Sequence, residues 1–280
     1  MGGGLDIHIF KVQIVTSLSF VKVVKFMAKE MKNPNSSHKN GWTPILTAAW
    51  SGHIEIVKWM AKFTENPNAP STFKWTPIHF ATRFGHVEII KFLSQFTDNP
   101  NAPYPDGKTP IHYAAELGHF EIVKFMASKI HNPNESYRNG WTPLQLAARY
   151  GHIEIVKFMC NFTNNPNEPD STGWTPIQVA AKFGHLEIVK FIATLTDNPN
   201  APNPSGWTPI HIAAVGGYAD IVEFLAKFTD NPNAPMMPSG KTPIDLAVKK
   251  CHLKVVNVLL EIITHKYLRP KKYKRRRYAY

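Results

Sequence analysis

The chain has 280 residues, of which 43% are hydrophobic, so it is able to bury a sizeable core. Its two cysteines, Cys160 and Cys251, are too few for a disulfide framework and fit a reducing, intracellular compartment. No apolar run reaches the roughly 20 residues of a membrane-spanning helix, and the first residues lack the basic flank of a secretory signal. These features argue against a membrane-spanning or disulfide-rich secreted protein.

The formal net charge of +12 is concentrated at the C-terminal end. Residues 265–280 contain eight lysines and arginines and no acidic residue, so the rest of the chain has a net charge of +4. The body of the protein is therefore only mildly basic, and the basic end is a region of its own.

Residues 1–9 form an N-terminal lead, and residues 10–41 form a degenerate copy of a unit that recurs later. The segment VKVVKFMAK at residues 21–29 matches IEIVKWMAK at residues 54–62, at an offset of 33 positions. The Thr-Pro pair that marks the later units is missing here. Such loss is typical of a capping unit at the end of a repeat array.

Seven further units occupy residues 42–264. Each unit contains a Thr-Pro pair, and a glycine follows nine residues after the threonine, except that Cys251 replaces it in the last unit. The threonines recur at intervals of 33 residues, with one interval of 34: Thr43, Thr76, Thr109, Thr142, Thr175, Thr208 and Thr242. This period predicts a solenoid of stacked units.

Each unit is predicted to form two short helices and a loop. Threonine is a good N-cap, proline suits the first helical position, and glycine supplies the left-handed residue that ends a helix. In the second helix, Glu55 faces the positive end of the helix dipole and is placed to pair with Lys58. The buried face of that helix is expected to contain Ile56, Val57, Met60 and Phe63.

The segments GWTPIHIAA at residues 206–214 and GHIEIVK at residues 52–58 and 151–157 resemble the ankyrin repeat. The resemblance implies an all-α repeat solenoid, an ankyrin-type helix-turn-helix stack with projecting β-turn or loop fingers. It also implies a concave groove, lined by the first helices and the fingers, that binds a protein partner without catalysis.

One departure from the family is consistent: a threonine stands where a glycine usually follows the second helix. We therefore expect that helix to end by a different turn, with threonine or asparagine side chains acting as caps. The threonines in question are Thr64, Thr97, Thr163, Thr196 and Thr229.

The 13 histidines recur at equivalent positions, mainly after the helix-ending glycine and after Thr-Pro-Ile. Equivalent positions in neighbouring units lie roughly 8–10 Å apart, whereas zinc holds its nitrogen ligands at about 2 Å. We interpret these histidines as hydrogen-bonding groups that link neighbouring units, and Gln145 and Gln178 in the same position fit this role. We predict no enzyme activity, metal or cofactor, and the sequence contains no nucleotide-binding, zinc or hydrolase motif.

Variable positions on the groove side are the candidate partner-binding residues. They precede either the capping threonine or the helix-ending glycine, and we call them the groove strip. Its members are Trp42, Trp50, Trp75, Arg83, Phe84, Glu116, Leu117, Trp141, Arg149, Tyr150, Trp174, Lys182, Phe183 and Trp207.

The groove strip combines aromatic residues with arginine and lysine, which are enriched at binding hot spots. We predict that a partner segment with acidic and apolar residues lies across repeats two to five, numbered from Thr43. The alternative is structural, because tryptophans that recur this regularly also serve to pack each finger on its neighbour. We expect the chain itself to be a monomer.

Residues 265–280 are predicted to form a disordered basic tail. They resemble a nuclear-import signal, and binding of nucleic acid or anionic lipid is the alternative. The primary prediction is a non-catalytic scaffold or adaptor that binds a partner protein. The alternatives are a nuclear or nucleic-acid-associated regulator and a targeting or regulatory subunit of a separate enzyme. The protein would work in the nucleus or cytoplasm. The basic residues concerned are Lys271, Lys272, Lys274, Arg275, Arg276 and Arg277.

Overall fold

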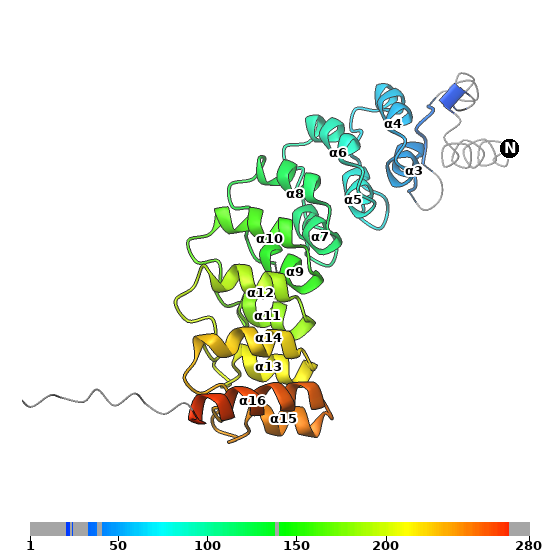
Figure 1. The fold of residues 1–280 in the computed structure, drawn as a ribbon. Helices are drawn as coiled ribbons and strands as arrows, with labels where there is room; N and C mark the ends of the chain where they lie inside the picture. Colours follow the sequence, from blue (N-terminus) through cyan, green and yellow to red (C-terminus); the bar gives the residue numbers. More distant parts are fainter. Residues whose placement is uncertain (1–20, 23, 25–32, 38–40, 138–139, 269–280) are drawn as a thin grey trace, which may run out of the picture. The chain divides into compact units, whose positions relative to one another are not determined.

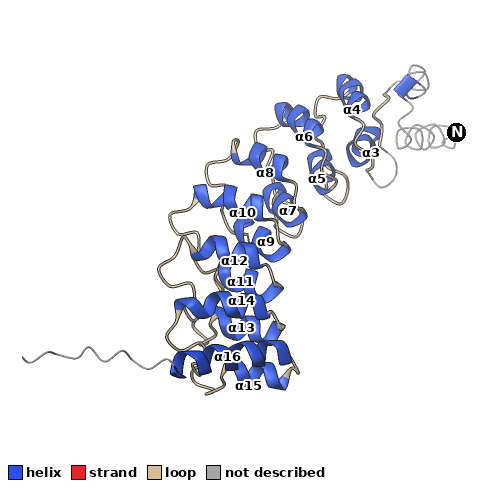
Figure 2. Cartoon of the chain, viewed as in Figure 1, coloured by secondary structure: helices blue, strands red, loops and turns tan. Residues whose placement is uncertain are grey.

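The structure is a computed structural model that describes residues 21–22, 24, 33–37, 41–137 and 140–268 (Figure 1). Helices and loops, with no strand, make up this described part of the chain (Figure 2). The chain divides into two units, residues 1–164 and 165–280. The expected all-α repeat solenoid is confirmed, because each unit is a stack of antiparallel helix pairs.

In the first unit, the first helices of the pairs pack side by side, and each second helix packs on its own first helix. The first helices are α3 (Pro44–Ser51), α5 (Pro77–Arg83), α7 (Pro110–Leu117) and α9 (Pro143–Tyr150). The second helices are α4 (Ile54–Met60), α6 (Val87–Leu93), α8 (Phe120–Ala127) and α10 (Ile153–Met159).

The second unit repeats this arrangement with three pairs. They are α11 (Pro176–Phe183) with α12 (Leu186–Ala193), α13 (Pro209–Gly216) with α14 (Ala219–Leu225), and α15 (Pro243–Lys249) with α16 (Leu253–Leu268). No helix in the described ranges combines the length and the apolarity that a bilayer crossing requires.

Each first helix begins with the predicted Thr-Pro pair. Its start is also capped by an asparagine of the preceding loop, which the sequence analysis did not predict. Thr43 Oγ1 accepts from the backbone N–H of Leu46 at 3.3 Å, and Pro44 has no N–H to satisfy. The N–H of Ile45, which lies between them, donates to Oδ1 of Asn35 at 3.1 Å. In the later repeats, the equivalent backbone N–H donates to the side-chain oxygen of Asn68, Asn101, Asn134, Asn167, Asn200 or Asn233. The second asparagine of each Asn-Pro-Asn loop therefore caps the first helix of the next repeat.

The helix-ending glycines adopt the predicted left-handed conformation, and a ring from the next repeat lies against most of them, histidine in four cases and Tyr218 at Gly184. Gly52 has a φ of 80°, and a Cβ atom added there would lie 2.6 Å from Cε1 of His86. Nε2 of His86 donates to the carbonyl oxygen of Trp50 at 3.1 Å. Equivalent bonds join His152 to Glu116 and His252 to Val215. The prediction that these histidines link neighbouring repeats by hydrogen bonds is confirmed.

The second helices end differently from the family pattern, as expected, but through their backbone. Four of them tighten into a 3₁₀ turn: Ala61–Phe63, Ser94–Phe96, Cys160–Phe162 and Ala226–Phe228. The threonine that follows is extended, and the side chains of Thr64 and Asn66 hydrogen-bond within the loop. The threonines named above therefore do not cap these helix ends, but side chains two residues earlier do so in two repeats: Asn161 donates to the carbonyl oxygen of Phe158 at 3.0 Å, and Thr194 donates to that of Phe191 at 2.7 Å.

Two further expectations need correction. Phe63 was expected in the core together with Ile56, Val57 and Met60, but its side chain is 40% exposed. The 3₁₀ turn has 3.0 residues per turn, so it rotates Phe63 onto the outer face, where its ring lies 4.7 Å from that of Trp59. The basic tail was expected from residue 265, but α16 continues to Leu268. Buried Val255 and Leu259 anchor this helix, which extends the regular structure into the tail.

The projecting fingers are turns of five residues, or of six at residues 236–241, that end at the residue before the capping threonine. In the second finger, residues 71–75, the N–H of Ser71 donates to the carbonyl oxygen of Trp75 at 2.8 Å. In the third finger, residues 104–108, Tyr104 and Lys108 make the same bond at 2.8 Å. The backbone of the finger is thus conserved between repeats while its side chains change.

Candidate functional site

The groove strip is built from pairs of residues eight positions apart, one from the finger and one from the last turn of the first helix. Arg83 lies over the ring of Trp75 at 5.9 Å, and Arg149 lies over that of Trp141 at 5.2 Å. In the second unit, Lys182 lies over Trp174 at 4.7 Å. Each cation therefore stabilises its own finger through a cation–π contact, which supports a structural contribution from these tryptophans.

The third repeat uses another chemistry at the same two positions. Lys108 forms an ion pair with Glu116, and both side chains are only 18% exposed. Burial alone would lower the pKa of Lys108, but the adjacent carboxylate of Glu116 outweighs this effect and raises the pKa. Tyr113 donates a hydrogen bond to Asp106 at 2.7 Å. The charges of this repeat are thus largely matched within the repeat itself.

The groove-strip residues differ in accessibility. Trp50, Arg83, Phe84, Leu117, Tyr150 and Lys182 are exposed, as expected for positions at an open helix end. The fingers' tryptophans are half-buried, and so are Arg149, Phe183 and Glu116. Because Trp174, Lys182, Phe183 and Trp207 belong to the second unit, the structure brings together only the members between Trp42 and Tyr150 within one unit.

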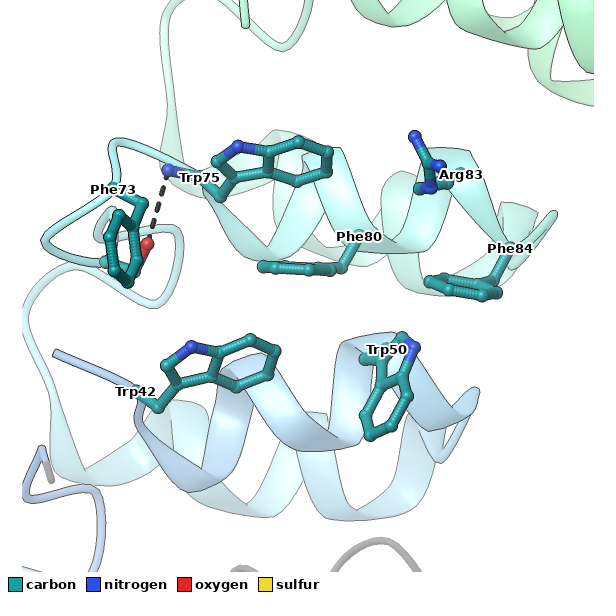
Figure 3. Close-up of a pocket in the computed structure, with 8 residues that line it drawn as sticks. Trp42, Trp50, Phe73, Trp75, Phe80, Arg83 and Phe84 are labelled. Carbon is teal, nitrogen blue, oxygen red and sulfur yellow. Dashed lines mark hydrogen bonds between the residues drawn. The ribbon is translucent and has the colours of Figure 1, made fainter. Parts of the chain in front are cut away.

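An apolar groove of about 280 Å³ lies between α3 and α5 on this strip, and we call it the aromatic groove (Figure 3). Ring centroids of neighbouring side chains lie 4.9 Å apart for Trp42 and Phe80, and 6.1 Å apart for Trp50 and Phe84. None of the described residues that line the groove is acidic. The lining consists of Trp42, Trp50, Ser71, Phe73, Trp75, Phe80, Arg83 and Phe84.

Two of these lining residues, Phe73 and Phe80, were missed by the sequence analysis. Phe80 lies one turn into α5, where it bridges Trp42 and Trp75. Phe73 lies in the second finger and is 64% exposed. A signal was present in the sequence, because the second finger reads STFKW and lacks the glycine that the other fingers place before the final residue.

Lys74 occupies that glycine position in a left-handed conformation, with a φ of 62°. Gly41, Gly107, Gly140, Gly173, Gly206 and Gly240 all have positive φ at the equivalent position. A left-handed conformation costs a non-glycine residue about 1–2 kcal/mol. The second finger therefore combines an exposed phenylalanine, an exposed lysine and local backbone strain.

The opposite face, formed by the second helices, also exposes aromatic rings but balances its charges. Phe92 and Phe96 lie 5.2 Å apart between ring centroids, as do Phe158 and Phe162. Glu88 pairs with Lys91 at 2.7 Å, and Glu55, Glu121 and Glu154 form equivalent pairs, as predicted for Glu55. The groove strip and the second-helix face thus differ in charge balance more than in aromatic content.

The remaining predicted elements are located as follows. The basic residues from Lys271 to Arg277 lie outside the described residues, as does most of the degenerate unit at residues 10–41. Within the described ranges, no cluster of three or more histidine, cysteine, aspartate or glutamate side chains is arranged to hold a metal ion. Cys160 is half-buried, and burial raises the pKa of its thiol to about 11, which disfavours the nucleophilic thiolate.

Comparison with known families agrees with the geometry. The profile for ankyrin repeats in three copies matches residues 62–137, 128–203 and 193–269, and the profile for a single ankyrin repeat matches residues 40–72. No curated protein matches the chain significantly. The capped first helices, the left-handed helix ends, the fingers and these matches lead to one conclusion. The chain belongs to the ankyrin repeat family.

Proposed function

We propose that the protein is a non-catalytic scaffold or adaptor that binds a partner protein through the groove strip of its first unit. Ankyrin repeats are generally protein–protein interaction modules, and ankyrin repeat proteins are typically non-catalytic. The partner segment is expected to carry acidic and apolar residues. The aromatic groove is the observation on which this proposal rests.

The aromatic groove has the composition of a binding hot spot. Trp50 is 43% exposed and Phe84 is 46% exposed, although both are large apolar residues. Among the described residues, Arg83 contacts the ring of Trp75 and forms no ion pair. Exposed aromatic side chains beside an unneutralised arginine favour a partner that brings apolar groups and a carboxylate.

The charge balance of the two faces favours the groove strip over the second-helix face. On the second-helix face, each exposed lysine of the Glu–Lys pairs already has a carboxylate neighbour. Such a face attracts an acidic partner only weakly. An acidic segment on the groove strip would instead meet Arg83, which forms no ion pair among the described residues, so electrostatic complementarity would set both the association rate and the specificity.

The test compares affinity capture by three forms of the protein, with quantitative mass spectrometry as the readout. The groove variant is Arg83→Glu/Arg149→Glu, and the matched control is Lys58→Glu/Lys157→Glu, which makes the same charge change on the second-helix face. The expected partner is retained by the wild type and by the control, and lost by the groove variant. Retention of the same partners by all three forms would contradict the proposal. A stoichiometric enzyme among the lost partners would specify a targeting role.

The basic tail supports a second role, because eight of the chain's lysines and arginines lie within residues 265–280. We propose that this segment directs the protein to the nucleus, with polyanion binding as the alternative. Fusion of residues 265–280 to a fluorescent cargo protein is expected to produce nuclear accumulation. A cytoplasmic signal, together with salt-sensitive binding of the full chain to nucleic acid, would favour the alternative.

A further inference from the structure

We propose that the aromatic groove recognises an extended, proline-rich segment flanked by acidic residues. This inference rests on the proposed function, because it names the class of partner segment that the groove strip receives. It follows from the shape of the groove, its length, and the positions of two cations.

The shape of the groove favours an extended chain. In Figure 3, Trp42 and Trp50 stand along α3, whereas Phe80 and Phe84 stand along α5 opposite them. The rings contact one another across the two helices, so they form a continuous apolar floor and leave about 280 Å³ above it. Such a floor has no deep slot for a single bulky anchor. Shallow aromatic-lined grooves are the surfaces on which polyproline II segments dock.

The length of the groove fits a short segment of this kind. The floor runs along α5, whose seven residues from Pro77 to Arg83 span about 10 Å at 1.5 Å per residue. A polyproline II chain rises about 3.1 Å per residue, so roughly three residues, or one turn, would cover the floor. A short extended segment therefore matches the length of the floor.

The charges around the groove favour acidic residues on both sides of the prolines. Arg83 lines the groove beside Phe84 at the end of α5 (Figure 3). Lys74 is exposed and lies in the second finger, between the lining residues Phe73 and Trp75 in the sequence. The finger and the helix end are the two limits of the aromatic floor. A segment that crosses the floor therefore contacts Arg83 at the helix end and leaves the groove at the finger that carries Lys74, and none of the described lining residues offers a competing carboxylate.

The backbone of the second finger gives an independent reason to regard Lys74 as selected for recognition. The equivalent position is glycine in the other fingers, and a glycine there would relieve the left-handed strain. Strained residues cluster at functional sites, where the surrounding structure maintains them.

The test measures the binding of a fluorescein-labelled peptide, with a run of prolines flanked on both sides by glutamates, by fluorescence anisotropy. The full chain is expected to bind it, and Trp50→Ala is expected to raise the Kd by about 30-fold, as for a hot-spot residue. Arg83→Glu and Lys74→Gly are each expected to raise it by about tenfold. Phe63→Ala and Lys58→Glu, on the second-helix face, serve as matched controls and should leave the Kd unchanged. Circular dichroism verifies the fold of each variant, and Arg83→Glu keeps the test valid if Trp50→Ala is poorly folded.

Three companion peptides separate this inference from the proposed function. In the first, glycine and serine replace the prolines; in the second, lysines replace the glutamates; the third is an acidic amphipathic helix with leucine anchors. The inference requires weaker binding of all three. Equal binding of the glycine–serine peptide, or tighter binding of the helix that is still lost in Arg83→Glu, would overturn the inference and leave the proposed function intact. Failure of the proposed function would appear instead as affinity capture that the groove variant does not change.

Discussion

The second and third fingers have the same backbone and bury their first residue, but they place their large aromatic residue at different positions. Both are closed by a 2.8 Å bond between the first N–H and the last carbonyl oxygen. In the third finger, Tyr104 turns inward: it is 3% exposed, its hydroxyl donates to the carbonyl oxygen of His79 at 2.8 Å, and its ring stacks on that of His79 at 3.9 Å. In the second finger, the first residue is the small and buried Ser71, and the large apolar residue is Phe73 at the third position, which is 64% exposed.

The charges of the two fingers differ in the same sense. Lys108 is neutralised by Glu116, whereas Lys74 stands exposed beside the aromatic groove. One turn therefore supports the stack, and its neighbour presents groups that the stack does not need. A finger therefore contributes to stability when its side chains contact the neighbouring helices, and it is available for binding when they remain exposed. Substitutions in the two fingers should separate these effects.

The largest effect is expected from the inward finger. Tyr104→Ala should lower the free energy of unfolding by about 4 kcal/mol, because it removes a buried aromatic ring from between two repeats. Tyr104→Phe, which removes only the hydroxyl that bonds to His79, should cost about 1 kcal/mol. Denaturant unfolding followed by tryptophan fluorescence measures both changes.

Phe73→Ala removes the exposed aromatic ring of the second finger, and its effect should stay within about 0.5 kcal/mol. Equal destabilisation by Phe73→Ala and Tyr104→Ala would show that both fingers are structural, and the distinction between them would be lost.

Acid should lower the free energy of unfolding, because it protonates histidines that are buried in the folded protein. Burial lowers the pKa of His112 to about 4, and the same cause lowers the pKa of His79 and His211. Between pH 6.5 and 4 the unfolded chain binds a proton at His112 that the folded chain does not, so stability falls as the pH falls through this range. At about 1.4 kcal/mol per unit, His112 alone should account for a loss of about 3 kcal/mol at pH 4.

His112→Gln is the variant that isolates this titration, because Gln145 already makes the same capping interaction with Thr142 at 3.1 Å. Unfolding free energies of the wild type and the variant, measured at pH 7 and at pH 4, should diverge by about 3 kcal/mol in favour of the variant at low pH. If the wild type and the variant lose the same free energy of unfolding between pH 7 and pH 4, protonation of His112 is not coupled to unfolding.

The fold was predictable because its signals repeat, whereas the site depends on departures from the repeat. Thr43 with Pro44 and Gly52 each specify a local conformation, and the structure confirms both. The cap from Asn35 to Ile45 links residues ten positions apart, so local rules for helix starts do not identify it. Phe63 was misplaced because the period of 3.6 residues does not hold through the 3₁₀ turn.

The groove strip was predicted in part. The positions of Trp50, Arg83 and Phe84 followed from their places beside helix ends, and their exposure is confirmed. Their pairing could not be predicted, since the contact between Trp75 and Arg83 depends on how the finger folds back over the helix. Partner contact by these residues stays a prediction that the capture experiment tests.

The smallest expected effect is the most specific for the comparison, because it exchanges the residue that occupies the left-handed position of each finger. Lys74→Gly should raise the free energy of unfolding by about 1 kcal/mol, since glycine adopts the left-handed conformation without steric cost. The reciprocal change, Gly107→Lys at a φ of 90°, should lower it by about 1–2 kcal/mol. Denaturant unfolding of both variants beside the wild type measures these shifts. If Lys74→Gly is also the variant that binds the acidic proline-rich peptide more weakly, the strain in the second finger serves recognition. A variant that gains stability and binds the peptide as tightly as the wild type would show that Lys74 has no part in the groove.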